Sequence, residues 1–325
     1  MRATRSVLRT IAAACCAVII CASTATAQSY PIRPIKFIVA FPPGGSTDVG
    51  ARVIAGYLSR VFGQQIYVEN KSGATGSIGT EAAAKSPPDG YTVLIAPDSV
   101  VSNPHVFRMN IDVLKDLVPV IQLSRQPIVL AVHHSLGVNS LAEFIVLAKQ
   151  RPGMSYASGA GAGSAQHLVP QWFAQIVGIQ LEHVPYRGGG QAINDLIAGH
   201  IKIGSLGSSP LIPHYKAGTL RLLAQTTEAR SPSLPEVPTY QEAGAKGLVL
   251  DQWLGVFVPA GTPPAIIARL NNEINKALTD QGIRDNFLQS AQEPVGGTAE
   301  QFSRLVHDDY EKLGRLVKEL NIKAN

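Results

Sequence analysis

The chain has 325 residues, 45% of them hydrophobic and 16% charged, which predicts a sizeable globular fold of two domains. Its 28 Lys and Arg exceed its 23 Asp and Glu by five, but three of the Arg lie in the first nine residues, so the rest of the chain carries an excess of two. A balance this mild is too small to imply binding to nucleic acid or to a membrane, and we expect no nucleic-acid partner.

The first 27 residues have the pattern of a secretory signal peptide. A basic start is followed by the apolar run 11–20 and then by the small-residue triplet 25–27, which has the form of a cleavage site. The apolar run is too short to span a bilayer. We therefore expect an exported chain that is cleaved after Ala27. All three cysteines lie in this segment, so we expect the mature chain to have no disulfide, thiolate nucleophile or cysteine metal site.

The mature chain opens with a predicted strand, a turn and a helix. Residues 35–40 are an apolar, β-branched run, and apolar residues recur at helical spacing over 49–61, with Gly63 placed to end that helix. In the turn between them we expect positive φ at Gly44 and Gly45. Unpaired N–H groups at such a helix start favour an anion, and because no lysine follows the glycines we expect a carboxylate rather than a triphosphate. The candidate caps of the helix are Ser46, Thr47 and Asp48.

The next segments repeat this order. Strands are predicted at 65–69 and 91–96, with a glycine-rich turn at 70–79 and a helix at 78–85 between them. The resulting βαβαβ unit predicts a parallel sheet with right-handed crossovers. Ligands of such sheets bind at the carboxyl ends of the strands. The turns after the three strands, the last of which contains Asp98 and Ser99, are therefore expected to face one crevice.

The pattern restarts in the middle of the chain, after predicted strands at 117–123 and 128–132. Three further strands are each followed by a turn of small residues and a helix start, so we expect a second sheet with the same kind of anion-binding turn. These strands are predicted at 154–157, 179–184 and 201–206, and the turns at 158–164, 186–190 and 207–210. The helices after the first two turns are predicted at 165–177 and 191–198, a further helix starts at the third turn, and a helix at 141–150 precedes the first strand.

The remaining elements complete an α/β fold of two lobes that close on a small anion. Strands are predicted at 220–225 and 252–258, a proline-spaced loop at 231–242, and helices at 265–278, 281–290 and 298–320. We expect these last helices to pack on the first lobe and make it discontinuous. Lobe 1 is then predicted to hold residues 28–128 and 252–325, and lobe 2 residues 129–251.

The ordered set of motifs resembles the periplasmic substrate-binding proteins of tripartite tricarboxylate transporters, also called Bug proteins. The resemblance covers essentially the whole mature chain, and its motifs lie at 41–48, 73–79, 88–91, 161–167, 185–188, 234–244 and 253–263. It implies two Rossmann-like lobes of the periplasmic binding protein type II kind, joined by two crossing strands. It also implies a monomeric, non-catalytic periplasmic protein that traps a carboxylate and delivers it to a membrane permease.

The resemblance also suggests which residues hold the ligand. The turn 44–48 of the first lobe would hold one carboxylate, and Ser158, Ser164 and the turn 186–188 would complete the site from the second lobe. Where the family commonly has Asp after an Ala-Gly pair, this chain has Lys202, which puts the second-lobe part of the specificity in doubt. The candidate ligand-binding residues are Pro43, Gly44, Gly45, Ser46, Thr47, Asp48, Asp98, Ser99, Ser158, Gly163, Ser164, Tyr186, Arg187 and Gly188.

Several of these residues also have a structural interpretation, and other functions stay open. Asp48 suits a helix cap as well as a ligand site, and His167 suits a packed histidine. The loop 159–164 has part of the dinucleotide-binding pattern, which would indicate an oxidoreductase, but Ser164 stands where the third glycine belongs. A hydrolase lacks its Gly-x-Ser-x-Gly turn. An exported sensor subunit for a membrane kinase is the other alternative. We expect neither a cofactor nor a metal.

Overall fold

The computed structural model describes residues 30–323, of which residues 33–323 belong to one compact unit. The predicted signal peptide and its cleavage after Ala27 lie outside the described residues. Within the described residues, no helix combines the length and the apolar character needed to cross a membrane.

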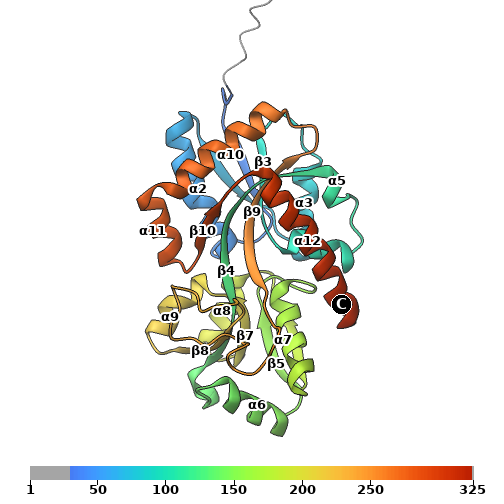
Figure 1. The fold of residues 1–325 in the computed structure, drawn as a ribbon, viewed down its shortest axis with the longest axis vertical. Helices are drawn as coiled ribbons and strands as arrows, with labels where there is room; N and C mark the ends of the chain where they lie inside the picture. The colour runs from blue at the N-terminus through green and yellow to red at the C-terminus, as the bar shows by residue number, and fades with distance from the viewer. Residues whose placement is uncertain (1–29, 324–325) are drawn as a thin grey trace, which may run out of the picture. The chain divides into compact units, whose positions relative to one another are not determined.

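Lobe 1 is built on a sheet with the strand order β2-β1-β3-β9-β4, with β10 on the far edge of β4 (Figure 1). Strand β1 pairs in parallel with β2 and β3, as the crossover pattern predicts, and β9 then pairs antiparallel with β3 and with β4. The buried residues of β1 and β3 form its core. The strands are β1 (Ile35–Val39), β2 (Ile66–Asn70), β3 (Thr92–Pro97), β4 (Leu117–His133), β9 (Asp251–Pro259) and β10 (Glu293–Gly296).

The helices of lobe 1 come from both ends of the chain. In Figure 1 α10 and α11 lie beside α2 in the upper lobe, and α12 lies on the other side of this lobe, near α3 and α5. On α12, Phe302 meets Trp253 edge to face at 5.3 Å between ring centroids, and this contact fixes the helix on β9. The helices of this lobe are α2 (Ser46–Phe62), η1 (Ala74–Gly76), α3 (Ser77–Ala84), α4 (Ser99–Ser102), η2 (Asn103–His105), α5 (Val113–Asp116), α10 (Pro264–Thr279), α11 (Gln281–Gln289) and α12 (Ala299–Glu319).

Lobe 2 is built on a second sheet with the order β6-β5-β7-β4, in which β8 also pairs with β4. The pairs β5–β6 and β5–β7 are parallel, so this lobe has the predicted strand–turn–helix units. The strands are β5 (Met154–Ser158), β6 (Leu181–Pro185), β7 (Ile203–Gly207) and β8 (Leu220–Gln225). The helices are η3 (His134–Leu136), α6 (Leu141–Gln150), α7 (Ala165–Val177), α8 (Gly189–Ile197), η4 (Ser209–Leu211) and α9 (Ile212–Lys216).

Strands β4 and β9 form the hinge between the lobes. The prediction of two strands at 117–123 and 128–132 was wrong, because β4 is one strand of 17 residues. Its first part pairs with β9 as far as Pro127, and from Ile128 it pairs with β7 and β8. Two irregularities in its register with β9 bend the strand. In Figure 1 both strands run from the upper lobe toward the lower one.

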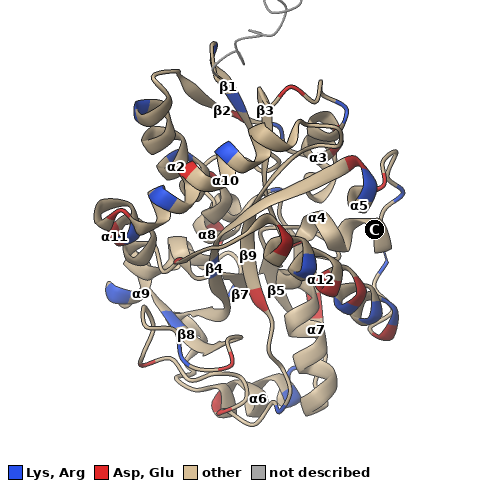
Figure 2. Cartoon of the chain, turned by 45° about the horizontal axis from the view of Figure 1, so that its top comes forward, with Lys and Arg blue, Asp and Glu red and all other residues tan. Residues whose placement is uncertain are grey.

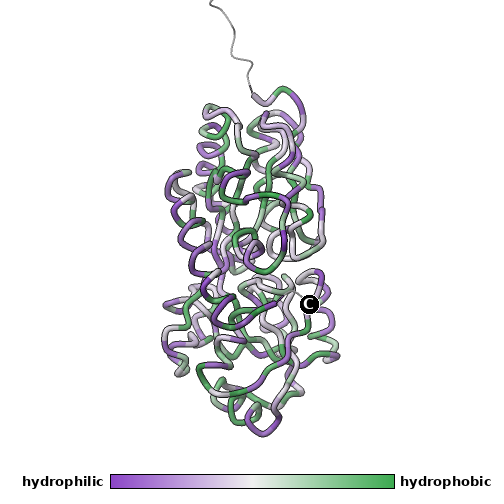
Figure 3. The backbone as a smooth tube through the Cα atoms, turned by 90° about the vertical axis from the view of Figure 1, so that its right-hand side faces the viewer, coloured by the Kyte–Doolittle hydropathy of each residue, from purple (hydrophilic) through white to green (hydrophobic). Residues whose placement is uncertain are grey.

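The hydropathy of the chain separates the inside of each lobe from its outer helices. In Figure 3 hydrophobic stretches run through the inside of each lobe, and hydrophilic stretches follow the outer helices. Figure 2 shows Lys, Arg, Asp and Glu scattered over these outer helices and loops, as expected for the mild net charge.

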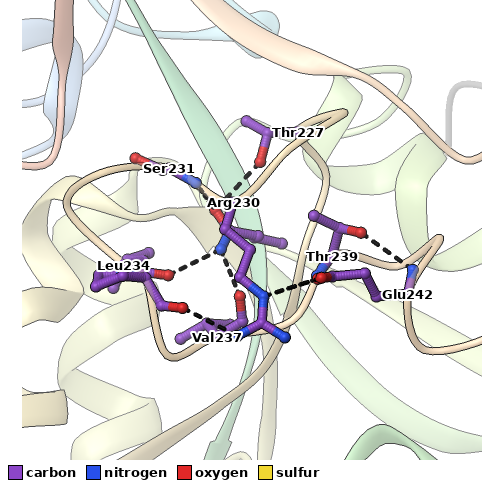
Figure 4. A network of polar contacts seen from close by, with 9 residues as sticks. Thr227, Arg230, Ser231, Leu234, Val237, Thr239 and Glu242 are labelled. Atoms are coloured by element: carbon purple, nitrogen blue, oxygen red, sulfur yellow. Dashed lines mark hydrogen bonds and ion pairs between the residues drawn. The ribbon is translucent and has the colours of Figure 1, made fainter.

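The predicted loop 231–242 is held by one buried side chain. The amide nitrogen of Gln225 donates to the carbonyl oxygens of Leu234 and Val237, at 3.0 and 2.6 Å, and its oxygen accepts from the N–H of Ser231 at 3.0 Å. An exposed ion pair between Arg230 and Glu242 closes the loop at 2.9 Å (Figure 4). These contacts replace the strand pairing that the prolines prevent.

Candidate functional site

Three hollows lie between the lobes and are lined by residues of both. The first, about 520 Å³, is bounded by the turn 72–76 and Phe107 of lobe 1 and by residues 160–162 and 185–187 of lobe 2. The second holds only about 30 Å³ and shares Ala160 with the first. The third, about 530 Å³, lies between residues 42–44 and the start of α8. The first and the third have the volume of a typical small-molecule site. The first is called the large cavity below, the second the small cavity and the third the third cavity.

The lobes touch each other around these cavities. A Cβ on Gly188 would stand 2.9 Å from the ring of Pro42, and a Cβ on Gly161 would collide with Thr75 across the cleft. Gly161 also has φ +78°, which side-chain-bearing residues rarely adopt. Glycine at these two positions therefore permits the closed arrangement of the lobes.

The start of α2 supplies the lobe 1 side of the small cavity. The helix begins at Ser46, and its N-cap is Gly45, with no side-chain cap. The predicted capping by Ser46, Thr47 or Asp48 was therefore wrong, because all three lie inside the first turn. Positive φ is confirmed for Gly44, at +87°, but not for Gly45, at −84°. Gly45, Ser46 and Thr47 line the cavity, and the first N–H groups of the helix have no partner within it.

Asp48 holds this turn in place. Its carboxylate accepts hydrogen bonds from the N–H of Gly44 at 3.2 Å, from Arg52 at 2.9 Å and from the side chain of Asn70 at 2.9 Å. Burial alone would raise the pKa of Asp48, but these hydrogen bonds outweigh burial and hold the pKa below its usual value. Asp48 is not among the lining residues of the three cavities, so the structure gives it the loop-fixing role.

The turn 72–76 lines the large cavity but was left out of the predicted site. Ala74 and Thr75 have φ of +46° and +55°, and the side chain of Asn103 donates to the Thr75 carbonyl at 2.9 Å. Such left-handed non-glycine residues cost energy and are often found at binding sites. The sequence signal was present, because this turn also joins a strand to a helix start and belongs to the motif at 73–79.

Ser158 and Ser164 have their hydroxyl groups engaged within lobe 2. The Ser158 hydroxyl lies 2.7 Å from Nε2 of His183. Ser164 is the N-cap of α7, and its hydroxyl accepts from the N–H of His167 and donates to the carbonyl of Gly161. The backbone between the two serines, residues 160–162, is what lines the large cavity.

Two stacked histidines support this loop. The rings of His167 and His183 lie 3.7 Å apart at 11°, and Nδ1 of His167 accepts the N–H of Gly163 at 3.1 Å. Burial lowers the pKa of His167 to about 4. Burial, with a smaller effect of His167, lowers the pKa of His183 to about 3. Both rings are therefore neutral at pH 7, which allows them to stack.

The turn after β6 offers one free cation. The Tyr186 ring lines the large cavity, but its hydroxyl donates to Asp195 at 2.7 Å, and burial followed by this contact raises its pKa to about 12. Arg187 lines the same cavity, is exposed, and has no ion-pair partner among the described residues. Gly188 and Pro43 line the third cavity.

Asp98 and Ser99 are buried at the end of β3 and are not lining residues of the three cavities. Gln166 and Gln252 do line the small cavity, although the sequence analysis did not name them. The N–H of Gly159 donates to Gln166 at 2.9 Å, and the oxygen of Gln252 accepts from Gln126 at 3.1 Å and Gln166 at 3.4 Å. The available signal for Gln252 was a polar residue at the start of the otherwise apolar predicted strand 252–258.

The described residues contain no group of three or more His, Cys, Asp or Glu side chains that could hold a metal ion. The arrangement of the cleft is instead suited to an anion. Gly45 at the start of α2 faces Gly189 at the start of α8, where a built Cβ would lie 3.9 Å from the Gly45 Cα. Two helix N-termini from opposite lobes, each with partial positive charge, thus meet at the small cavity.

The sequence model of the family described as "Tripartite tricarboxylate transporter family receptor" matches residues 50–322. The chain belongs to this family. Among the relatives of this receptor, protein BugT of Bordetella pertussis is 38% identical over 306 residues, which cover 93% of this chain and 94% of BugT. The resemblance to Bug proteins is thereby confirmed.

Solved structures of related receptors have the same fold. R. palustris Rpa4515 with adipate has a TM-score of 0.88 and 34% identity, with 91% of this chain and all of that chain covered. The periplasmic binding protein BugD has a TM-score of 0.86 and 27% identity over the same shares. MatC of Rhodopseudomonas palustris with bound malate has a TM-score of 0.82 and 26% identity, with 89% of this receptor and all of MatC covered. The predicted α/β fold of two lobes and a hinge, of the type II-like kind, is confirmed.

Proposed function

We propose that this receptor captures a small carboxylate between its lobes and delivers it, unchanged, to a membrane transporter of the tripartite tricarboxylate type. The observation that carries the proposal is the meeting of the α2 and α8 N-termini at one cavity. An empty site of this kind places two positive helix ends together, so a bound carboxylate stabilises the closed arrangement. The adipate in Rpa4515 and the malate in MatC support this ligand class.

The geometry of the cavities suggests how such a ligand lies. One carboxylate occupies the small cavity at Ser46 and Thr47, and the body of the ligand extends past Ala160 into the large cavity. Arg187 then pairs with a second carboxylate at the rim. The other residues of the candidate list, of which Pro43 is the first and Gly188 the last, stay predictions. Asp48 and Ser164 would act indirectly, through the loops that they hold in place.

Export, cleavage after Ala27, a monomeric state and the transporter partnership are parts of the same proposal. So is the division into lobe 1 (residues 28–128 and 252–325) and lobe 2 (residues 129–251). The change of strand partners along β4, between Pro127 and Ile128, supports it.

Calorimetry on the mature protein tests the proposal, with adipate, malate and hexanoate as probes. Hexanoate has the chain length of adipate but lacks its second carboxylate. Charge-assisted hydrogen bonds contribute about 1.5–3 kcal/mol each, so several of them give a dissociation constant around micromolar or tighter after the cost of closure. We expect saturable binding of a dicarboxylate and its recovery unchanged. Binding no tighter than millimolar across a broad carboxylate panel would contradict the proposal.

A further inference from the structure

Asp98 carries a buried carboxylate for which the described residues supply no counter-charge. It follows β3 directly, and the residue is only 2% exposed. Neither carboxylate oxygen has a hydrogen bond of regular geometry to any described residue. Burying an ionised carboxylate in this way is costly unless the group is paired or takes up a proton.

Part of the surroundings of Asp98 comes from the other lobe. The N–H of Ala165, at the start of α7, and the side-chain amide of Gln252, on the hinge strand β9, lie near enough to favour its charged form. The loop that leads to Ala165 also touches lobe 1, because a Cβ on Gly163 would collide with Val106. The closed arrangement of the lobes therefore helps to bury Asp98.

The titratable groups around Asp98 do not neutralise it. Asp309 on α12 is a second carboxyl group, which accepts a hydrogen bond from Trp253 at 2.6 Å. His167, on the first turn of α7, is neutral at pH 7 because burial lowers its pKa to about 4. Burial first, and then Asp309, raise the pKa of Asp98 to about 7, against the weaker opposing effect of its own backbone, Ala165 and Gln252. Exposed to water, the same group has an ordinary value of 3.8.

We propose that Asp98 is a positioning residue that couples closure of the lobes on a solute to the uptake of a proton. The inference rests on the proposed function, since it takes closure as the step that traps the ligand. When the lobes separate, α7 moves away from β3, water reaches Asp98 and the carboxyl group ionises. When they close, Asp98 is protonated and its hydroxyl can donate to a neighbouring acceptor.

Linkage gives the size of the effect. With a carboxyl group that titrates near 7 in the closed form and near 4 in the open form, closure takes up roughly half a proton at pH 7. Solute affinity then falls about tenfold between pH 6 and pH 8. Asp98→Asn cannot titrate, so it removes this dependence.

A disulfide across the cleft tests the coupling without any ligand. The mature chain, residues 28–325, contains no cysteine. A Cβ on Gly188 would lie 3.3 Å from the Cβ of Pro42, close to the spacing of a disulfide, and the extended backbone at Gly188 accepts any residue. Pro42→Cys with Gly188→Cys therefore locks the lobes when oxidised and releases them when reduced. Thr75→Cys with Gly161→Cys, at 3.3 Å between Cβ positions, is the second pair if the first does not cross-link, although a side chain at position 161 is strained by the left-handed φ of +78° there.

The measurement is the carbon-13 NMR titration of the Asp98 carboxyl carbon, identified as the signal that is missing in Asp98→Asn. We expect an apparent pKa near 7 in the oxidised protein and a value lower by at least two units in the reduced, ligand-free protein. The same pKa in both states, or a value near 4 in the locked protein, would overturn the coupling. The titration does not depend on which solute binds. If the pKa of Asp98 does not change between the two states, the proposed function still stands. If no carboxylate of the panel binds, the titration still shows whether closure of the lobes changes the pKa of Asp98.

Discussion

Gly45 is the residue at which the site is most easily tested. It lies at the N-terminus of α2, and a Cβ placed on it would meet no atom within 4 Å. Its φ of −84° is compatible with any L-residue. A side chain here therefore enters the cavity without straining the fold.

We predict that Gly45→Val abolishes carboxylate binding with little change in melting temperature, because the branched side chain fills the space in front of the α2 N–H groups. Gly56→Val is the matched control, since Gly56 is exposed on the same helix and its Cβ would also meet nothing within 4 Å. Calorimetry and thermal melting of both variants give the comparison. Unaltered affinity in Gly45→Val would remove the α2 turn from the site.

Arg187 is the residue that we propose to bind the second carboxylate of the ligand. Losing a charge-assisted contact of about 1.5–3 kcal/mol weakens binding by roughly 10- to 100-fold. We therefore expect Arg187→Ala to lose this much affinity for the dicarboxylate that the wild type binds best. Arg187→Lys keeps the charge but not the bidentate geometry, so it should recover part of the loss. Equal affinities of wild type and Arg187→Ala would place the second carboxylate elsewhere.

At the scale of elements, the stacked histidines make the loop after β5 sensitive to acid. In the folded chain the pKa of His167 lies near 4 and that of His183 near 3, below the ordinary value of 6.5. At pH values between these lowered pKa values and 6.5, the two histidines therefore bind more protons in the unfolded chain than in the folded chain. Their contribution to the free energy of unfolding is fully present above pH 6.5 and is lost as the pH falls toward 4. For each histidine the slope reaches about 1.4 kcal/mol per pH unit.

We predict that His183→Asn lowers stability at pH 7, because the stack is lost, but flattens this dependence. Urea unfolding of wild type and variant at pH 7.5, 6.5, 5.5 and 4.5 measures it. The difference in free energy between the two proteins should shrink as the pH falls. A difference that stays constant over this range would mean that the ring is not buried in its neutral form.

The elements themselves could be predicted well where capping and periodicity agree. Helices α6 and α7 have the predicted bounds, because Ser140 and Ser164 cap them and glycine or a turn ends them. Strand β4 was predicted as two strands, and Pro127 lies in the segment between them. In the structure Pro127 stands where β4 changes partners, which is a position that tolerates a residue without an N–H.

The candidate site was harder to predict, since the sequence does not show which way a polar side chain points. The family resemblance suggested Ser158 as a ligand contact, yet its hydroxyl turns toward His183. The turn 72–76 and residues 160–162 line the cavity largely with backbone and small side chains, which leave no chemical signature. Gln252 lines the small cavity from the hinge strand β9, and its position there depends on a crossing of strands that only the tertiary fold creates.

At the scale of the whole molecule, the hinge strands join two lobes whose facing turns contain glycine where they touch. Closure of this arrangement by a ligand requires that the ligand bind the closed form more tightly than the open form. In the proposed function the two helix N-termini provide that difference, because they lie together at the small cavity where the lobes meet. Small-angle X-ray scattering should therefore show a smaller radius of gyration with the bound dicarboxylate than without it, and an unchanged radius would argue against closure as the trapping step.

The most direct test of the central claim, that a carboxylate is held between the lobes at the α2 turn, is native mass spectrometry of the mature protein as it is purified from the periplasm. The wild type is predicted to carry one small carboxylate per chain, released on denaturation and identified by its mass, while Gly45→Val prepared in parallel carries none. An empty wild-type protein that also ignores the carboxylate panel, or a ligand retained equally by Gly45→Val, would contradict the account.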